Sequence, residues 1–116
     1  MYRLRNLTRG TSLGDAIDLA DTSRKRRVGL LKHTELRPGE GLWIVPCESV
    51  HTFFMKFAID LLYVDRKNIV RKIVPGVPPW RLSMCLSAHS IVELAAGSIE
   101  PTGTRKGDQL DFESLG

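Results

Sequence analysis

The sequence predicts a small, mostly β domain of the α+β class, with one α-helix and a largely antiparallel sheet curled into a barrel or small sandwich. Three observations predict this class. The 116 residues suffice for one domain. Six or seven short segments carry strand patterns, and a single segment, at about 22–33, carries a helical one. Most of the connections are too short for parallel crossovers, which favours antiparallel pairing.

The first elements are two strands. Tyr2 to Thr8 alternates apolar and basic residues, as expected of a short strand. Gly10 to Gly14 is rich in turn-forming residues, and Ile17 and Leu19 then flank Asp18 in the pattern of a half-buried second strand.

The helix is expected from about Thr22 to His33. Asp21 or Thr22 can cap its first backbone N–H groups, while Val28 and Leu31 lie three residues apart on one face. Gly29 lies inside this segment at a cost of about 1 kcal/mol relative to alanine, which predicts close packing or an early helix end.

The central segments predict a hairpin. Leu42 to Val45 is a buried strand that ends before Pro46. Every odd position from Phe53 to Tyr63 is apolar, which predicts a long strand, in one or two pieces. Asp65 to Asn68 forms the turn, and Ile69 to Val74 returns as the partner strand.

Two further strands follow, at Ser90 to Leu94 and Gln109 to Phe112. The segment Pro75 to Pro79 between the hairpin and these strands contains three prolines and a glycine, so we expect no regular structure there.

Charge and composition narrow the function classes. The formal net charge is +4, and residues 1–37 carry nine basic and four acidic groups. The excess centres on Arg24, Lys25, Arg26 and Arg27, which form either a contact for a polyanion or a solvated helix face. No apolar stretch approaches the roughly 20 residues that cross a bilayer, and the start lacks an apolar signal-peptide core. We therefore expect a cytoplasmic protein with no membrane partner.

Cys47 and His51 are the most suggestive pair. No Walker-type loop, H-E-x-x-H, G-x-S-x-G or G-x-G-x-x-G signature occurs in the chain. A thiol and an imidazole four residues apart can form a nucleophile or contribute to a metal site, but each use needs further groups. The alternative is a buried cysteine and a hydrogen-bonded histidine with structural roles. We expect no cofactor.

Lys56 and Asp60 are charged residues in the long strand and need partners. If the hairpin closes through Asp65 to Asn68, Leu62 faces Arg71, and Asp60 lies diagonal to that arginine. The pair is then a structural salt bridge or part of a site.

Glu93 is a carboxylate inside an apolar run, and Arg81 follows Trp80 on a proline-rich loop. Glu93 points either to solvent or into a cavity, where its pKa would shift. We therefore expect a cleft edged by Cys47, His51, Lys56, Asp60, Arg81 and Glu93.

An ordered set of short motifs between about residues 20 and 113 resembles the family of uncharacterised proteins called domain-of-unknown-function family 192. The motifs are Arg26-x-x-Gly29-Leu30-Leu31, Gly41-Leu42-Trp43, Ile59-Asp60 through Asp65, Pro78-Pro79-Trp80-Arg81, Ala88 through Gly97, and Gly107-Asp108. Pro46-Cys47 and His51-Thr52 mark the chain as a variant branch. The resemblance implies a small β-rich fold and supplies no reaction.

The expected function is binding of a small ligand or a protein partner without catalysis. The first alternative is an enzyme or metal site built on Cys47 and His51. The weaker alternative is polyanion binding through Arg24 to Arg27, with nucleic acid not expected as a partner.

Overall fold

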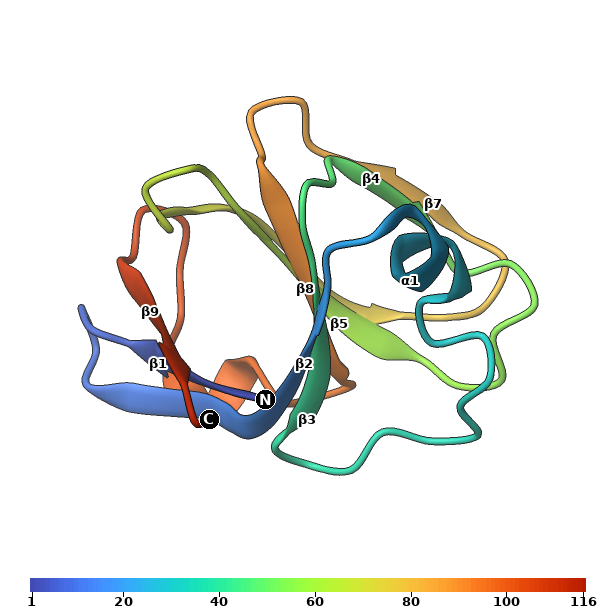
Figure 1. Cartoon of the computed structure of the whole chain (residues 1–116). Helices are drawn as coiled ribbons and strands as arrows, with labels where there is room; N and C mark the ends of the chain where they lie inside the picture. Colours follow the sequence, from blue (N-terminus) through green and yellow to red (C-terminus); the bar gives the residue numbers. More distant parts are fainter.

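Seven strands form one curled sheet, and a two-stranded ribbon lies over its outer face (Figure 1). The computed structural model describes residues 1–116. The sheet has the order β6-β5-β8-β3-β2-β1-β9, in which only β2 and β3 pair in parallel. Its strands are β1 (Tyr2–Asn6), β2 (Thr11–Ala20), β3 (Glu40–Ile44), β5 (Ile59–Val64), β6 (Val70–Val77), β8 (Ser90–Ala95) and β9 (Leu110–Ser114). The ribbon pairs β4 (Ser49–His51) with β7 (Leu82–Met84), and the helical elements are α1 (Ser23–Val28) and the 3-10 turn η1 (Glu100–Thr102).

The sheet curls until its two ends meet on one side. There Ile69 forms a β-bridge with Gln109, and the backbone N–H of Leu110 donates to the carbonyl of Asn68 at 2.9 Å. Figure 1 shows the resulting ring, in which β9 approaches the turn between β5 and β6. The prediction of a mostly β fold with a curled sheet and one helix is confirmed.

Two hydrophobic cores lie on opposite faces of the central strands. Residues of β5 alternate between them: Leu62 and Val64 face the inside of the curl, whereas Leu61 and Tyr63 face the layer formed by α1 and the ribbon. Every residue of β5 and β8 is buried for this reason. The same alternation decides which polar side chains enter the outer layer.

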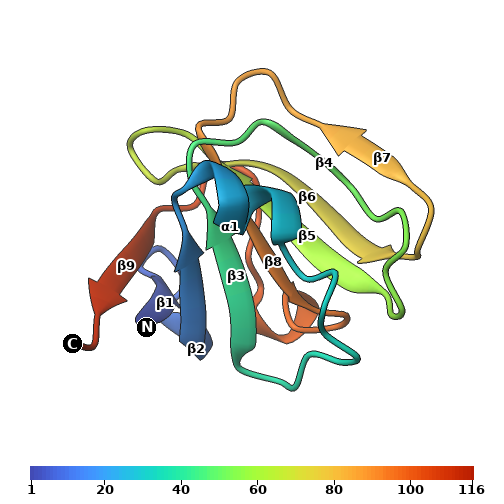
Figure 2. The same cartoon turned by 45° about the vertical axis from the view of Figure 1, so that its right-hand side comes forward.

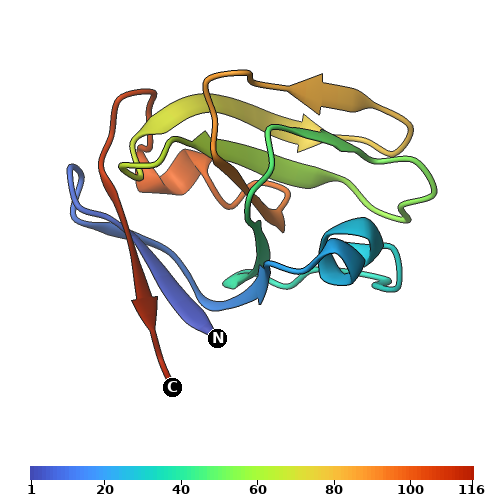
Figure 3. The ribbon, with the colours of Figure 1, turned by 45° about the horizontal axis from the view of Figure 1, so that its top comes forward.

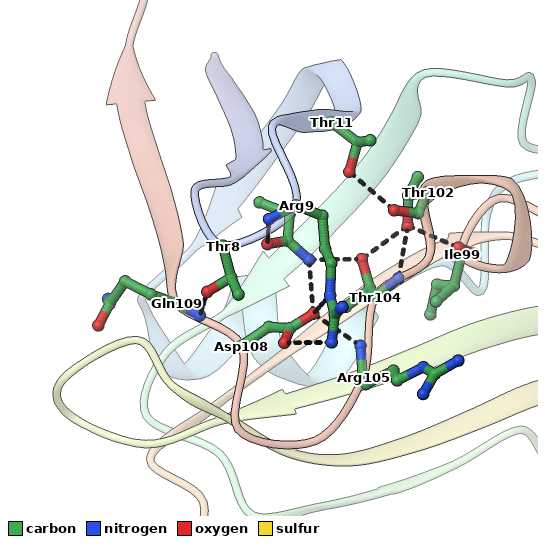
Figure 4. A network of polar contacts seen from close by, with 10 residues as sticks. Thr8, Arg9, Thr11, Ile99, Thr102, Thr104, Arg105, Asp108 and Gln109 are labelled. Carbon is green, nitrogen blue, oxygen red and sulfur yellow. Dashed lines mark hydrogen bonds and ion pairs between the residues drawn. The ribbon is translucent and has the colours of Figure 1, made fainter.

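A buried polar network closes one end of the curl (Figure 4). Asp108 accepts hydrogen bonds from Asn6 Nδ2 at 3.0 Å, Arg9 Nε at 3.0 Å and the backbone N–H of Arg105 at 2.9 Å. Asn6 also donates to the hydroxyl of Thr104 at 2.9 Å. The hydrogen bond from the Arg9 guanidinium, with help from Asn6, lowers the pKa of Asp108 to about 2.

Two predicted elements are shorter than expected. The helix begins after Thr22, whose side chain accepts from Lys25 N at 3.1 Å, but ends at Val28 because Gly29 takes a φ of 49°. The strand predicted from Phe53 begins only at Ile59. No helix in the structure is long and apolar enough to span a bilayer.

The hairpin register differs from the expected one. Leu62 pairs with Ile73 because irregularities shift the register along β5 and β6. The predicted pairing of Asp60 with Arg71 is therefore wrong, and Arg71 Nε instead contacts Asp65 at 2.8 Å. β6 also continues through Pro75 to Val77, so the expectation of no regular structure is wrong for these residues. A strand at the edge of the sheet tolerates proline, which lacks a backbone N–H, because it pairs with a neighbour on one side only.

Candidate functional site

A cavity of about 560 Å³ opens between α1, β4 and the outer face of the sheet. In Figure 2, α1 lies in front of β3 and below the segment that leads into β4. The lining combines apolar side chains with a few ionisable ones. It includes Arg26, Arg27, Leu30, Leu31, Ile44, Cys47, Val50, His51, Met55 and Glu93.

Glu93 is the buried ionisable group of this cavity. It lies on β8 between Leu42 of β3 and Leu61 of β5, so both of its cross-strand neighbours are apolar. Its neighbours along the strand, Val92 and Leu94, face the inside of the curl, and Glu93 therefore faces the outer layer. The residue is only 3% exposed.

The Glu93 carboxyl makes no hydrogen bond or ion pair with the rest of the protein. Its burial raises the pKa from the ordinary 4.5 to about 7, and no opposing contribution from a donor or a cation accompanies this effect. Buried carboxyl groups in folded proteins are normally hydrogen-bonded. A carboxyl with a raised pKa that faces a cavity and has no partner in the chain is thus the unusual chemical feature of the molecule.

Cys47 lies in the same cavity, just after the cis peptide bond between Val45 and Pro46. Its thiol donates to the carbonyl of Ser49 at 3.0 Å, and its backbone N–H donates to the carbonyl of His89 at 2.8 Å. Burial raises the pKa of the thiol, and the charge of Glu93 adds to this effect. The environment thus favours the neutral thiol over the reactive thiolate.

His51 lines the cavity from the outer strand β4 and makes no hydrogen bond with Cys47. Its ring stacks on Phe53 with centroids 5.0 Å apart, and Phe53 in turn stacks on Trp80 at 5.7 Å. No group of three His, Cys, Asp or Glu side chains lies close enough together to hold a metal ion. The pair therefore lacks both the further ligands of a metal site and the contact of a thiol–imidazole couple.

The four basic residues of α1, Arg24 to Arg27, differ in their contacts. The guanidinium of Arg26 donates to the backbone carbonyls of Asp21 at 3.0 Å and Val45 at 3.1 Å, which fastens the helix to the end of β3. Arg24, Lys25 and Arg27 are exposed. Of these three, Arg27 lies at the edge of the cavity.

Asp60, Lys56 and Arg81 lie outside this cavity. Asp60 faces the inside of the curl, where it accepts backbone N–H bonds from Gly76 at 2.8 Å, Gly97 at 3.1 Å and Ile99 at 3.1 Å. Lys56 is exposed in the loop before β5. Arg81 lines the neighbouring groove. The six residues expected to edge one cleft thus fall into separate places, and Cys47, His51 and Glu93 share the cavity.

Sequence reasoning missed the apolar half of the lining. Leu30 and Leu31 follow the helix in a tight turn rather than continuing it, and Met55 is buried in the irregular segment before β5. Their apolar character was the available signal. It indicated burial but not which cavity they would line.

Comparison with known proteins places the chain in a family. The family model DUF192, described as "Uncharacterized ACR", matches residues 5–112. The chain belongs to the DUF192 family. This match extends the expected resemblance, which began near residue 20, across β2 and to the last two residues of β1.

Two archaeal relatives and two crystal structures resemble this DUF192 chain. The UPF0127 proteins of Thermococcus sibiricus and Pyrococcus furiosus are each 31% identical to it over 95% of its length, covering 74% and 97% of those proteins. A "putative transcription regulator" from Sinorhizobium meliloti shares 21% identity and a TM-score of 0.81 over 96% of this chain and 91% of that one. A protein of unknown function from Novosphingobium aromaticivorans shares 19% identity and a TM-score of 0.80, over 95% and 82%. At these identities the crystal structures support the fold alone.

Proposed function

We propose that this domain binds a small molecule in the cavity between α1 and β4, without catalysis of its own, and that the ligand presents a protonated amine to Glu93. The observation that carries this proposal is the Glu93 carboxyl, which is 3% exposed, has no hydrogen-bond partner in the chain, and lines a cavity of about 560 Å³.

The Glu93 carboxyl loses most of its hydration in the fold without gaining a hydrogen bond, although its oxygens are not fully enclosed, and this burial weakens the empty protein. A ligand amine would supply both a hydrogen bond and the opposite charge, and it would lower the pKa of Glu93 back towards the ordinary range. This new hydrogen bond and charge pair would contribute favourably to the free energy of binding. Structures commonly keep such groups at functional sites.

The rest of the lining suits a small ligand with an apolar body. Leu30, Leu31, Ile44 and Val50 offer hydrocarbon surface around the carboxyl. The volume falls in the range of about 300–1,000 Å³ that is typical of small-molecule sites.

The state of Cys47 favours binding over chemistry. Its thiol is engaged with the Ser49 carbonyl, and its pKa is raised, so it lacks the activation that a nucleophilic cysteine needs. The two cysteines of the chain are free thiols. A reducing compartment would keep them so, and we assign the protein to the cytoplasm as part of the same proposal.

The test is a titration with benzylamine at pH 8, followed by ¹H–¹⁵N NMR. We expect shifts in the amide signals of Leu30, Ile44, Cys47 and Glu93, and no comparable shifts with benzyl alcohol, which has the same ring but no charge. Glu93→Gln should abolish these shifts, because the neutral amide can no longer pair with the ammonium group.

The matched control is Glu48→Gln, which removes an exposed carboxylate next to Cys47 and should leave the titration unchanged. Equal shifts with the alcohol, or an unchanged titration in Glu93→Gln, would show that the carboxyl does not select the ligand. A panel of linear and branched amines that leaves all four signals in place would overturn the proposal as a whole.

A further inference from the structure

A second, larger hollow lies on the other side of the ribbon. This groove, of about 810 Å³, runs between β6 and β7, and Figure 3 shows these two strands next to each other at one edge of the molecule. It shares only Ser49, Val50 and His51 of β4 with the Glu93 cavity. The ribbon thus separates two hollows of different chemical character.

The groove contains cations and no carboxylate. Its ionisable lining residues are His51, Lys72 and Arg81. Lys72 is held in place because its ammonium group donates to the carbonyl of Met84 at 2.8 Å and lies 5.7 Å from the centre of the Tyr63 ring. Arg81 forms no ion pair, and its only side-chain hydrogen bond is to the carbonyl of Trp80 at 3.4 Å. The positive charge of the groove is therefore not neutralised by this chain.

The wider segment strengthens this charge. Between residues 49 and 89 the acidic residues are Asp60, which is buried and bonded to backbone N–H groups, and Asp65, which pairs with Arg71. The basic residues there are Lys56, Arg66, Lys67, Arg71, Lys72 and Arg81.

Two large apolar side chains, Leu82 and Met84, line the groove, and Trp80 and Leu86 lie next to them in the sequence; these four residues are called the rim. Leu82 and Met84 lie two residues apart on one face of β7 and are 75% and 56% exposed. Trp80 precedes them and is 56% exposed, and Leu86 follows at 74%. Several large apolar side chains left exposed within a short segment are typical of an interaction surface.

The loop that carries Trp80 is fixed by hydrogen bonds and contains strained backbone conformations. Thr52 is buried and fastens the loop: its carbonyl accepts from Trp80 N at 3.1 Å, and its hydroxyl accepts from Arg81 N at 2.9 Å and donates to the carbonyl of Pro78 at 2.7 Å. Trp80 has a φ of 68°, and Phe54, whose ring meets it edge-on at 4.7 Å, has a φ of 66°. Such conformations cost bulky residues about 1–3 kcal/mol each and are concentrated at functional sites.

We propose that the groove and its rim bind an acidic, apolar segment of another protein. The carboxylates of that segment would pair with Lys72 and Arg81, and its apolar side chains would cover Trp80, Leu82 and Met84. Leu82 and Met84 lie two residues apart on β7, about 7 Å along the strand, which matches the spacing of alternate side chains in an extended segment. A second copy of this chain fits poorly because its own corresponding face carries the same positive charge.

The test uses a ten-residue peptide of alternating glutamate and leucine, added to the ¹⁵N-labelled full chain. We expect saturable shifts at Lys72, Leu82 and Met84, and weak or absent shifts with the peptide in which glutamine replaces glutamate. The double variant Arg81→Glu, Leu82→Ser should weaken binding roughly tenfold or more. Arg24→Glu makes the same charge change on exposed α1 and should alter binding by less than about twofold.

The same experiment distinguishes an acidic peptide partner from the other possible partners of this surface. The proposal is overturned if the glutamine peptide binds equally well, or if Arg24→Glu weakens binding as much as the double variant. It is also overturned if phosphatidylglycerol vesicles or oligo-dT shift these signals and the acidic peptide does not, or if the signals depend on protein concentration alone. Because these residues differ from those that report benzylamine, failure here leaves the Glu93 proposal intact.

Discussion

Replacing Glu93 with glutamine should stabilise the protein at neutral and alkaline pH. Glutamine has nearly the shape of the protonated carboxyl but carries no charge at any pH. The wild-type side chain must become an unpartnered buried anion as the pH rises, because no donor or cation in the chain compensates for its burial. The variant avoids this step and keeps the packing around Leu42 and Leu61.

The size of the effect follows from the pKa of Glu93, which is about 7 in the folded protein against an ordinary 4.5. Between these two pH values the folded state binds the proton more tightly than the unfolded state does. The free energy of unfolding therefore falls as the pH rises from about 4.5 to about 7, and this contribution is constant outside the window. At about 1.4 kcal/mol per pKa unit, the loss by pH 8 is about 3 kcal/mol.

Urea denaturation at 25 °C, repeated from pH 4 to pH 8, measures this difference. We expect Glu93→Gln and the wild type to be equally stable near pH 4 and to diverge by up to about 3 kcal/mol at pH 8, with the variant more stable. The control Glu48→Gln alters an exposed carboxylate and should follow the wild type within about 0.5 kcal/mol. A Glu93→Gln variant that is less stable than the wild type at pH 8, or that keeps its pH dependence, would refute the reasoning.

Three further predictions concern the polar groups elsewhere. Asp108→Asn should lower the free energy of unfolding at pH 7 by about 2 kcal/mol, since an amide cannot keep every donor bond or the charge pair with Arg9. Because the pKa of Asp108 is lowered, its contribution is present above about pH 4 and lost as the pH falls towards 2 in acid denaturation. An unchanged urea midpoint would contradict the first statement. Asp60→Asn should cost a similar amount but leave the benzylamine titration intact, whereas loss of binding by the folded variant would place Asp60 in the site. In a Cys85→Ser background, iodoacetamide should alkylate Cys47 more slowly at pH 8 than it alkylates glutathione, because burial raises the pKa of the thiol; equal rates would indicate an activated cysteine.

Much of the fold could be predicted from local pattern. The alternation in Ile59–Val64 and the turn residues Asp65 to Asn68 predict the hairpin, and Val70–Val77 supplies its return strand. These signals are local, since each depends on neighbours within a few residues.

The ribbon could not be predicted in the same way. Ser49–His51 and Leu82–Met84 are three-residue strands that lie more than 30 residues apart in sequence, and each is exposed at its ends. Their pairing depends on the loop that Thr52 holds to Arg81, a contact that no periodicity reveals. The predicted register of the hairpin was wrong for a related reason: β-bulges shift the register, and they have no reliable sequence signature.

The candidate site was predictable only in part. The alternation of Ser90–Ala95 places Glu93 opposite to Val92 and Leu94, but it leaves open whether that side faces water or a second layer. The layer exists because the helix and the ribbon fold over β5 and β8. Asp60 lies outside the site because it precedes Leu61 on β5. Leu61 pairs with Glu93 and shares its face of the sheet, so Asp60 points to the opposite face.

The most direct test of the account is a ¹³C NMR titration of the Glu93 side-chain carboxyl in the folded protein. The account predicts a midpoint near pH 7, displaced to lower pH when benzylamine is present. A midpoint between pH 4 and pH 5, unaffected by the amine, would mean that water or a partner within the chain already satisfies the carboxyl.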